Sequence, residues 1–218
     1  MSASDVDESK LPLRERSRRD KLRRIREATE QLLHTRTLAE ITMRDVARLA
    51  GIGEATLFRY VAVKEDLLLH VFGHRMEDFI TSVEANPRFR PRSGATGRVV
   101  VNRVRELYRL RADFYLASPE NVTDYVRIGL STGNALGGLS VEHGDRFIHV
   151  VENLLRAGQQ DGVIAGDWDA HTVAGNCHGL FIHEILRSPA RHFPAGTFPQ
   201  RIDERLRTQL EPLVRVPG

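Results

Sequence analysis

The sequence predicts an all-α protein in which a small N-terminal helical domain precedes a larger helical domain. Three observations support this prediction. Apolar residues recur at helical spacing along most of the chain, no segment alternates apolar and polar residues over a useful length, and breaks rich in Gly and Pro separate the apolar stretches. A hydrophobic fraction of 41% in 218 residues supplies enough apolar side chains for a buried core.

The composition excludes several classes of protein. No apolar run approaches the roughly 18 residues of a membrane span, and residues 1–10 lack the apolar centre of a signal peptide. Cys177 is the only cysteine, so neither an intrachain disulfide nor a cysteine-cluster metal site can form. We therefore expect a cytoplasmic protein with no membrane partner, no metal and no cofactor.

Positive charge is concentrated near the N-terminus. Residues 14–26 carry eight basic and two acidic side chains, whereas the whole chain has a formal net charge of only +3. Such a cluster is an electrostatic footprint for a polyanion, with nucleic acid as the first candidate. The alternative is a solvated, flexible arm. We expect residues 1–15 to form a disordered polar arm.

Four helices are expected in the first part of the chain. The first runs from residue 16 to about 36 on apolar positions at helical spacing. Thr42 and Asp45 form a Thr-x-x-acid start for a second helix, residues 43–50, which Gly51 ends. A third helix follows Gly53 and extends through Tyr60. A fourth begins near residue 64 and continues towards residue 84.

Beyond the break at residues 86–94, the pattern remains helical. A long amphipathic helix follows residue 100 and is closed by Pro119, a short helix covers residues 121–130, and another covers residues 147–160. Asp167 is the expected cap of a helix that ends at Pro189, and a last helix follows to residue 213.

The second and third helices have the spacing of a helix-turn-helix. Ala47 is small enough for a close helix crossing, Gly51 can take the positive φ of the turn, and Leu57 returns to the wedge between the helices. This geometry places the second helix of the pair in a DNA major groove. The residues left facing outward are Glu54, Ala55, Thr56 and Arg59.

Residues 20–72 resemble the N-terminal domain of the TetR family of bacterial repressors. The family pattern is a hydroxyl cap, V/I-A-x-x-A-G-V, T-L/V-Y/F-x-Y-F and a K-E/D-x-L start to the fourth helix. It is matched here by Thr42, Val46-Ala47, Ala50-Gly51-Ile52, Thr56-Leu57-Phe58-Arg59-Tyr60 and Lys64-Glu65-Asp66-Leu67. Two positions depart from the pattern, because Gly53 and Val63 stand where the family usually has helix-capping side chains.

The resemblance implies a DNA-binding domain at residues 16–72 whose partner is a double-stranded operator. Thr42, Tyr60 and Lys64 would hold phosphates, which fixes the register on the duplex. Arg44, Ala55, Thr56 and Arg59 would lie nearest the base edges. Gly53 and Glu54 are also expected in the DNA-binding surface. The alternative for two of the phosphate contacts is that Tyr60 packs beneath the first helix and that Lys64 is merely solvated.

The resemblance also implies that residues 73–218 form a helical domain for dimerisation and for an unknown small-molecule effector. Helices at about 168–188 and 200–214 would pair in a homodimer as a four-helix bundle, with Ala174, Gly175 and Gly179 allowing close approach. The candidate effector contacts are Phe79, Leu107, Tyr108, Phe114, Trp168 and His178. Each of these could instead be an ordinary core residue.

We therefore expect a homodimeric repressor that releases a pseudo-palindromic operator when an effector moves the helix at residues 64–84. Activation remains open, as do the identities of the effector and the operator.

Two other classes fit isolated patterns. Gly129, Ser131 and Gly133 match the G-x-S-x-G nucleophile elbow of hydrolases, with Asp145 or Asp167 and His171 as partners, but that motif needs a strand that the chain does not offer. His70, His74 and Asp78 share a helix face, as do His171 and His178, which permits a metal-sensing or pH-sensing repressor. The alternative is that these residues are ordinary polar or pocket-lining positions on helices.

Overall fold

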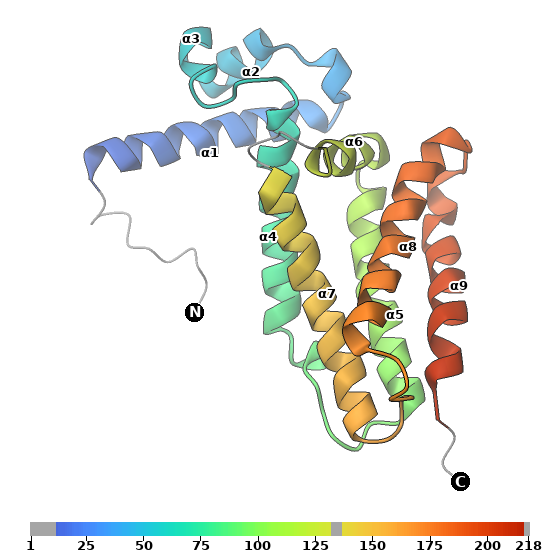
Figure 1. The fold of residues 1–218 in the computed structure, drawn as a ribbon. Coiled ribbons are helices and arrows are strands. Elements are labelled where there is room, and N and C mark those ends of the chain that lie inside the picture. Colours follow the sequence, from blue (N-terminus) through green and yellow to red (C-terminus); the bar gives the residue numbers. More distant parts are fainter. Residues whose placement is uncertain (1–11, 132–136, 216–218) are drawn as a thin grey trace.

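The computed structural model describes residues 12–131 and 137–215, which form two helical domains (Figure 1). The smaller domain contains α1 (Leu13–Leu33), α2 (Met43–Ala50) and α3 (Glu54–Leu57). The larger contains α4 (Asp66–Ala85), α5 (Gly97–Leu116), α6 (Pro119–Gly129), α7 (Gly137–Gln160), α8 (Ala170–Ala190) and α9 (Phe198–Leu210). Short 3-10 turns occupy Leu38–Glu40, Pro87–Phe89, Ala195–Thr197 and Glu211–Leu213.

The all-α prediction is confirmed for the described part of the chain, where the only β-type pairing is an isolated bridge between Ile164 and Val214. Within that part, no helix has the length and apolarity that a membrane span requires.

The local signals at the start of α2 operate as the sequence predicts. The Asp45 backbone N–H donates to Thr42 Oγ1 at 3.1 Å, and the Asp45 carboxylate accepts the Thr42 N–H in return at 3.3 Å. This reciprocal pair satisfies two backbone donors that the first helical turn would leave free. Gly51 ends the helix with a φ of 62°, a left-handed conformation that disfavours side chains with a Cβ.

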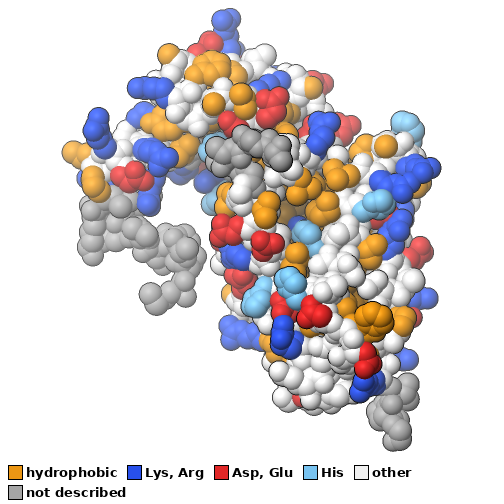
Figure 2. Space-filling model, viewed as in Figure 1, with side chains coloured by type: hydrophobic (Ala, Val, Ile, Leu, Met, Phe, Trp, Pro, Cys, Tyr) orange, Lys and Arg blue, Asp and Glu red, His pale blue; other side chains and the backbone are white. Residues whose placement is uncertain are grey.

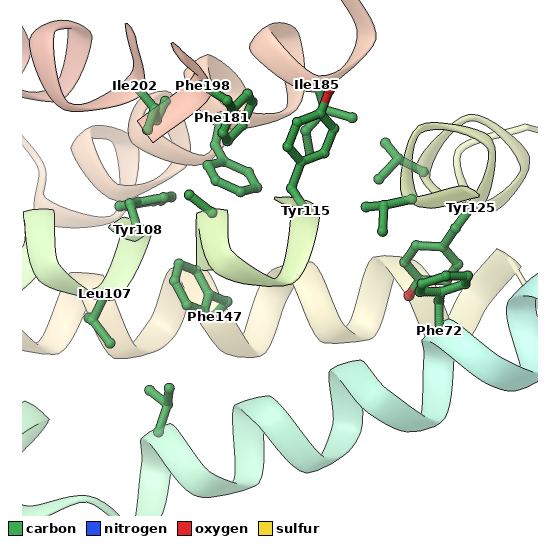
Figure 3. Close-up of a cluster of buried hydrophobic side chains, with 14 of the residues drawn as sticks. Phe72, Leu107, Tyr108, Tyr115, Tyr125, Phe147, Phe181, Ile185, Phe198 and Ile202 are labelled. Carbon is green, nitrogen blue, oxygen red and sulfur yellow. The ribbon is translucent and has the colours of Figure 1, made fainter. Parts of the chain in front are cut away.

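The larger domain is organised around a core of aromatic side chains (Figure 3). The Tyr108 ring lies against Phe147 of α7 and Phe181 of α8, with ring centroids 5.2 and 5.6 Å apart. Phe198 continues this cluster to α9, because its ring packs on both Tyr115 and Phe181. Aromatic pairs of this kind add to the stabilisation from burial and fix α5 against α7, α8 and α9.

Helix α4 connects the two domains. It extends from the helix-turn-helix down one side of the larger domain (Figure 1). At the middle of the helix, Arg75 donates from Nε to the Glu30 carboxylate of α1 at 2.7 Å. Its buried residues include Phe72, which contacts Phe114 of α5 and Tyr125 of α6. The helix is therefore part of both cores.

Several predicted boundaries in the N-terminal domain are wrong. Helix α1 begins at Leu13, so residues 14–26 lie on a helix and not on a flexible arm. The remainder of the predicted arm, residues 1–11, lies outside the described residues. The recognition helix is also shorter than expected, because regular α-helix ends at Leu57 and turns follow to Tyr60.

Boundaries in the larger domain also differ from the prediction. Helix α7 begins at Gly137, ten residues before Phe147, because buried contacts of His143 and Gly144 outweigh the weak helix propensity of the glycines. Asp169, not Asp167, caps α8 by accepting the Thr172 N–H at 2.7 Å. Pro189 lies inside the last turn of that helix.

Candidate DNA-binding surface and ligand cavity

The turn between α2 and α3 positions the candidate DNA-reading helix. The Ile52 N–H donates to the Ala47 carbonyl at 3.0 Å, which closes the turn around Gly51. Arg24 of α1 braces it, because its Nη2 donates to the Gly51 carbonyl at 2.8 Å. Leu57 is completely buried beneath the helix. The turn, α1 and the Leu57 wedge together fix which side of α3 faces outward.

The outward side of α3 carries short or donor-bearing groups. Glu54, Ala55 and Arg59 are exposed, and Thr56 is half-buried. Arg59 donates from Nη2 to the Thr56 hydroxyl at 3.2 Å, which keeps the guanidinium over this surface. Gly53 precedes the helix as its N-cap, without a side-chain contact. These residues form one surface, as the helix-turn-helix spacing predicts.

Arg44 extends this surface from α2. Its Nε lies 2.9 Å from Glu54 Oε1, although the arginine side chain is 82% exposed. An ion pair this exposed contributes little to stability, so it can be exchanged for contacts to another acceptor. It brings Arg44 beside the start of α3.

The three predicted phosphate contacts have different surroundings. Thr42 is exposed, but its hydroxyl already serves the α2 cap. Lys64 donates from Nζ to the Ala39 carbonyl at 3.0 Å, so it is anchored to the preceding 3-10 turn and is not simply solvated. Tyr60 is half-buried and packs against the core, in line with the structural alternative for that residue.

Basic side chains continue along α1 beside this surface (Figure 2). Some of the charge is compensated locally, since Arg23 pairs with Asp20 and Glu27, and Arg19 pairs with Glu15. These contacts lie on the helix surface, where water screens them. The positive cluster therefore faces solvent on a helix, α1, that is adjacent to the outward surface of α2 and α3.

A cavity of about 220 Å³ lies inside the larger domain. Helices α4 to α8 each contribute to its wall, and hydrophobic side chains surround a hollow near α6 and α8 (Figure 2). Most of the lining is apolar: Met76, Phe114, Tyr115, Val122, Tyr125, Val126, Leu130, Val141, Ile148, Phe181, Ile182 and Ile185. The polar lining residues are Arg111, Ser140, His143, Asp145 and His178.

Buried Arg111 and half-buried His178 form a pair in the cavity wall. Arg111 Nη1 lies 2.8 Å from His178 Nδ1, so the guanidinium donates and the imidazole nitrogen accepts. Burial, together with the Arg111 charge, lowers the pKa of His178 to about 3. The ring is therefore neutral at physiological pH, which removes His178 as the protonated switch of a pH sensor.

His143 is the second histidine of the wall. Its Nε2 lies 3.0 Å from the Glu77 carboxylate, while its Nδ1 has no hydrogen-bond partner. Burial lowers the pKa of His143 more than the nearby Glu77 raises it. Arg146 also binds Glu77, at 2.7 Å, so the Glu77 charge is already shared.

The predicted effector contacts divide into three groups. Phe114 and His178 line the cavity. Leu107 and Tyr108 are completely buried core residues, and Phe79 stacks on Phe147 in the same core. Trp168 is 63% exposed before α8 and does not line this cavity.

Arg111 is the charged cavity residue with the lowest exposure, and it is among the lining residues that the sequence interpretation missed. Its position carried a signal, because it follows Leu107 by four residues and Tyr108 by three, which puts a charge on the apolar face of α5. Asn121 was also missed. Its side-chain oxygen accepts the buried Leu38 N–H at 3.1 Å and so connects α6 to the smaller domain.

The hydrolase and metal patterns have structural roles. Ser131 donates to the Ile128 carbonyl at 2.6 Å, at the end of a helix and not on a strand-to-helix elbow; Gly133 lies outside the described residues. His74 pairs with Asp78 at 3.5 Å, whereas His70 is half-buried. In the described segments, no three His, Cys, Asp or Glu side chains converge as metal ligands.

The structure combines a helix-turn-helix that has an outward donor surface with a second domain that has an internal cavity, and helix α4 joins the two. Residues 25–71 match the model of bacterial regulatory proteins, tetR family. The helix-turn-helix segment of this chain is therefore similar to the N-terminal domain of TetR-family regulators. The family and the similar solved structures consist of transcriptional regulators and not of enzymes. A comparison with curated protein sequences finds no match.

Solved structures with the same fold cover nearly the whole chain. A TetR-family transcriptional repressor, FadR of Thermus thermophilus in complex with lauroyl-CoA, is 19% identical with a TM-score of 0.68, covering 90% of this chain and 97% of that one. FadR of Bacillus subtilis in complex with stearoyl-CoA is 16% identical (TM-score 0.61; 90% and 99% coverage). A TetR transcription regulator of Haloarcula marismortui is 15% identical (TM-score 0.65; 90% and 100% coverage). At these identities the likeness shows the fold alone.

Proposed function

We propose that the chain is a homodimeric transcriptional repressor that binds a pseudo-palindromic operator and releases it when a small molecule enters the cavity. The observation that carries this proposal is the position of α4. Its Arg75 binds α1 of the smaller domain, and its Met76, the next residue, lines the cavity. A single helix therefore contacts both the DNA-reading domain and the effector space.

Sequence-specific binding is supported by the exposed surface of α2 and α3. Arg59 and Arg44 can pair bidentately with guanine edges, while Lys64 and the α1 arginines supply charge for phosphates. Two such surfaces in one dimer would enter successive major grooves, which requires an operator with two-fold symmetry.

Dimerisation through α8 and α9 is supported by their position and by the outer surface of α8. These two helices lie side by side at one edge of the domain (Figure 1). A Cβ added at Gly175 or Gly179 would meet no atom within 4 Å, so both glycines leave room for a partner helix. Ala174, in contrast, is completely buried within the protomer and belongs to its own core.

Release by an effector is supported by two contacts between the domains. The Arg75–Glu30 pair joins α4 to α1, and the Asn121–Leu38 hydrogen bond joins α6 to the smaller domain. Both α4 and α6 line the cavity. A ligand that fits one arrangement of these helices better than another shifts the population of DNA-binding geometries by that difference in affinity. The acyl-CoA complexes of the two FadR proteins support a small-molecule site in this fold.

Fluorescence anisotropy with the DNA upstream of the protein's own gene tests the proposal. We expect saturable binding that survives an excess of random duplex, at two salt concentrations. Arg59→Ala should weaken specific binding by about 5- to 100-fold, because one bidentate base contact is lost. Arg98→Ala is the matched control, since this exposed arginine lies at the start of α5, outside the reading surface.

Two outcomes would contradict the proposal. In the first, random duplex displaces the protein from the upstream DNA as effectively as the upstream DNA itself does, at both salt concentrations. Random duplex would also have to displace the protein equally well from genomic fragments that the protein had selected. Alternatively, sedimentation of the free protein could yield a monomer that a Gly179→Arg substitution leaves unchanged, which would refute the dimer through α8.

A further inference from the structure

Arg111 is a buried cation without an anionic partner. Its side chain belongs to the cavity wall, and the residue is only 6% exposed. No Asp or Glu in the described segments forms a salt bridge with it, and its Nε has no hydrogen-bond partner. An isolated charge that is removed from water destabilises a fold by several kcal/mol unless something compensates it.

Two aromatic rings hold the guanidinium in place. Its central carbon lies 4.6 Å from the Phe147 ring centroid and 4.9 Å from that of Phe181. These cation–π contacts occupy its flat faces and leave the N–H groups to bond in the guanidinium plane. A carboxylate has the planar, two-oxygen geometry that fits such an N–H edge.

The remaining polar groups of the cavity do not neutralise this charge. His178 accepts a hydrogen bond from Arg111 as a neutral ring, and it contributes no negative charge. Asp145 lines the cavity but is exposed to solvent, and its carboxylate does not lie within ion-pair distance of Arg111. His143 bonds Glu77, which in turn is bound by Arg146.

We propose that the effector is a compact amphipathic monocarboxylate whose carboxylate binds Arg111 and whose apolar part fills the cavity. The inference rests on the proposed function, because it treats this cavity as the effector site. One cation matches one negative charge, and the largely aliphatic and aromatic lining matches an apolar body. The volume of about 220 Å³ lies below the roughly 300–1,000 Å³ typical of ligand pockets, which favours a small molecule.

An acyl chain of an acyl-CoA would not supply the missing negative charge. Its thioester and hydrocarbon chain are uncharged, so a chain buried in the cavity would leave Arg111 unpaired. A phosphate dianion would leave one negative charge uncompensated in apolar surroundings. The carboxylate accounts for both the buried cation and the apolar lining.

Isothermal titration calorimetry on the full-length protein, without DNA, tests the proposal. The probes are butyrate, hexanoate, octanoate, benzoate and phenylacetate, each compared with its neutral primary amide, together with lauroyl-CoA. We expect at least one carboxylate to bind about 10- to 100-fold more tightly than its amide, because a hydrogen-bonded charge pair is present only with the acid. Arg111→Gln should abolish this preference, whereas Arg109→Gln, an exposed arginine of the same helix, should retain it.

Three results would overturn the proposal: carboxylates and amides bind equally, all five carboxylates fail to bind, or Arg111→Gln keeps the preference for the acid. Lauroyl-CoA that binds Arg111→Gln as tightly as the wild type, with no carboxylate bound by either, would assign the cavity to a neutral chain. Should Arg111→Gln fail to fold, the comparison of acid with amide in the wild type still decides. Because no DNA is present, failure here is distinct from failure of operator binding.

Discussion

The two domains place arginine in opposite environments. Arg59 lies on the outer surface of the helix-turn-helix, where water solvates its charge and its guanidinium donates to the Thr56 hydroxyl. Arg111 lies inside the larger domain, between two phenylalanine rings. Burial lowers the pKa of Arg111 to about 10, because removal from water disfavours its charged form.

In the smaller domain, the side chains proposed to function in DNA binding are not those that stabilise the fold. In the larger domain, the residues around the cavity have both roles. The candidate DNA-contacting side chains lie outside the core of the smaller domain, so we expect substitutions there to affect DNA binding more than folding. The cavity residues of the larger domain are part of its core, so a group suited to a ligand also affects folding. Each of the following substitutions tests one side of this comparison.

The largest effect is expected inside the core of the smaller domain. Leu57→Ala removes a completely buried side chain, which should lower the free energy of unfolding by about 2–5 kcal/mol and abolish operator binding. Urea unfolding measures the change. Phe58→Ala, at an adjacent position that is 50% exposed, should change stability by no more than about 0.5 kcal/mol. Equal effects of the two substitutions would mean that α3 does not pack as described.

Arg111→Met should have the opposite sign and stabilise the free protein by about 1–3 kcal/mol. The lowered pKa corresponds to a penalty of about 3 kcal/mol on the charged form, and the lost cation–π contacts offset part of the gain. Because the pKa of Arg111 in the folded state lies below its value in the unfolded chain, the penalty is complete below about pH 10 and decreases as the pH rises above that value.

Thermal unfolding of Arg111→Met and of the exposed control Arg109→Met at neutral pH checks this prediction. If Arg111→Met is destabilised while Arg109→Met is unchanged, the two phenylalanine rings alone compensate the buried charge. The charge of Arg111 would then not destabilise the protein when the cavity is empty.

The junction between the domains should give a smaller effect. Asn121→Ala leaves the buried Leu38 N–H without its acceptor and should destabilise the protein by about 1–2 kcal/mol. Hydrogen exchange of the Leu38 amide should accelerate in the alanine variant, and an unchanged rate would exclude this contact as a connection between the domains.

The smallest effect is expected on the surface of α1. Arg16→Gln should leave stability unchanged and reduce the slope of log affinity against log salt by about 1 if the side chain contacts a phosphate. Arg98→Gln controls for the general change in charge. If neither variant changes the slope of log affinity against log salt, Arg16 is solvated by water and does not contact a phosphate.

The sequence predicted the smaller domain well because its signals are local. Thr42 and Asp45 lie three residues apart and satisfy each other's backbone donors, and Gly51 takes a backbone conformation that few other residues adopt. These requirements depend on neighbours in the chain, so they can be recognised without a tertiary structure. The C-terminal end of α3 was predicted too late in the chain, because the helical spacing of side chains continues through Tyr60 although regular α-helix ends at Leu57.

The sequence was less informative about the larger domain. Helical periodicity identified its helices but not the start of α7, where contacts with other helices outweigh the glycines. Aromatic residues were expected to line a cavity, yet Tyr108 is core and Trp168 is exposed. Periodicity states which face of a helix is apolar, and it does not distinguish a packed face from one that borders a space.

The sequence by itself determined that the protein is helical, where its helix-turn-helix lies and which side chains that motif turns outward, since each follows from residues within a few positions of one another. Only the tertiary structure decided that Arg111 is buried without an anion, that Asn121 joins the two domains and that five helices enclose the cavity. These properties depend on atoms brought together from distant segments, and the free energy of a buried charge depends on all of them at once.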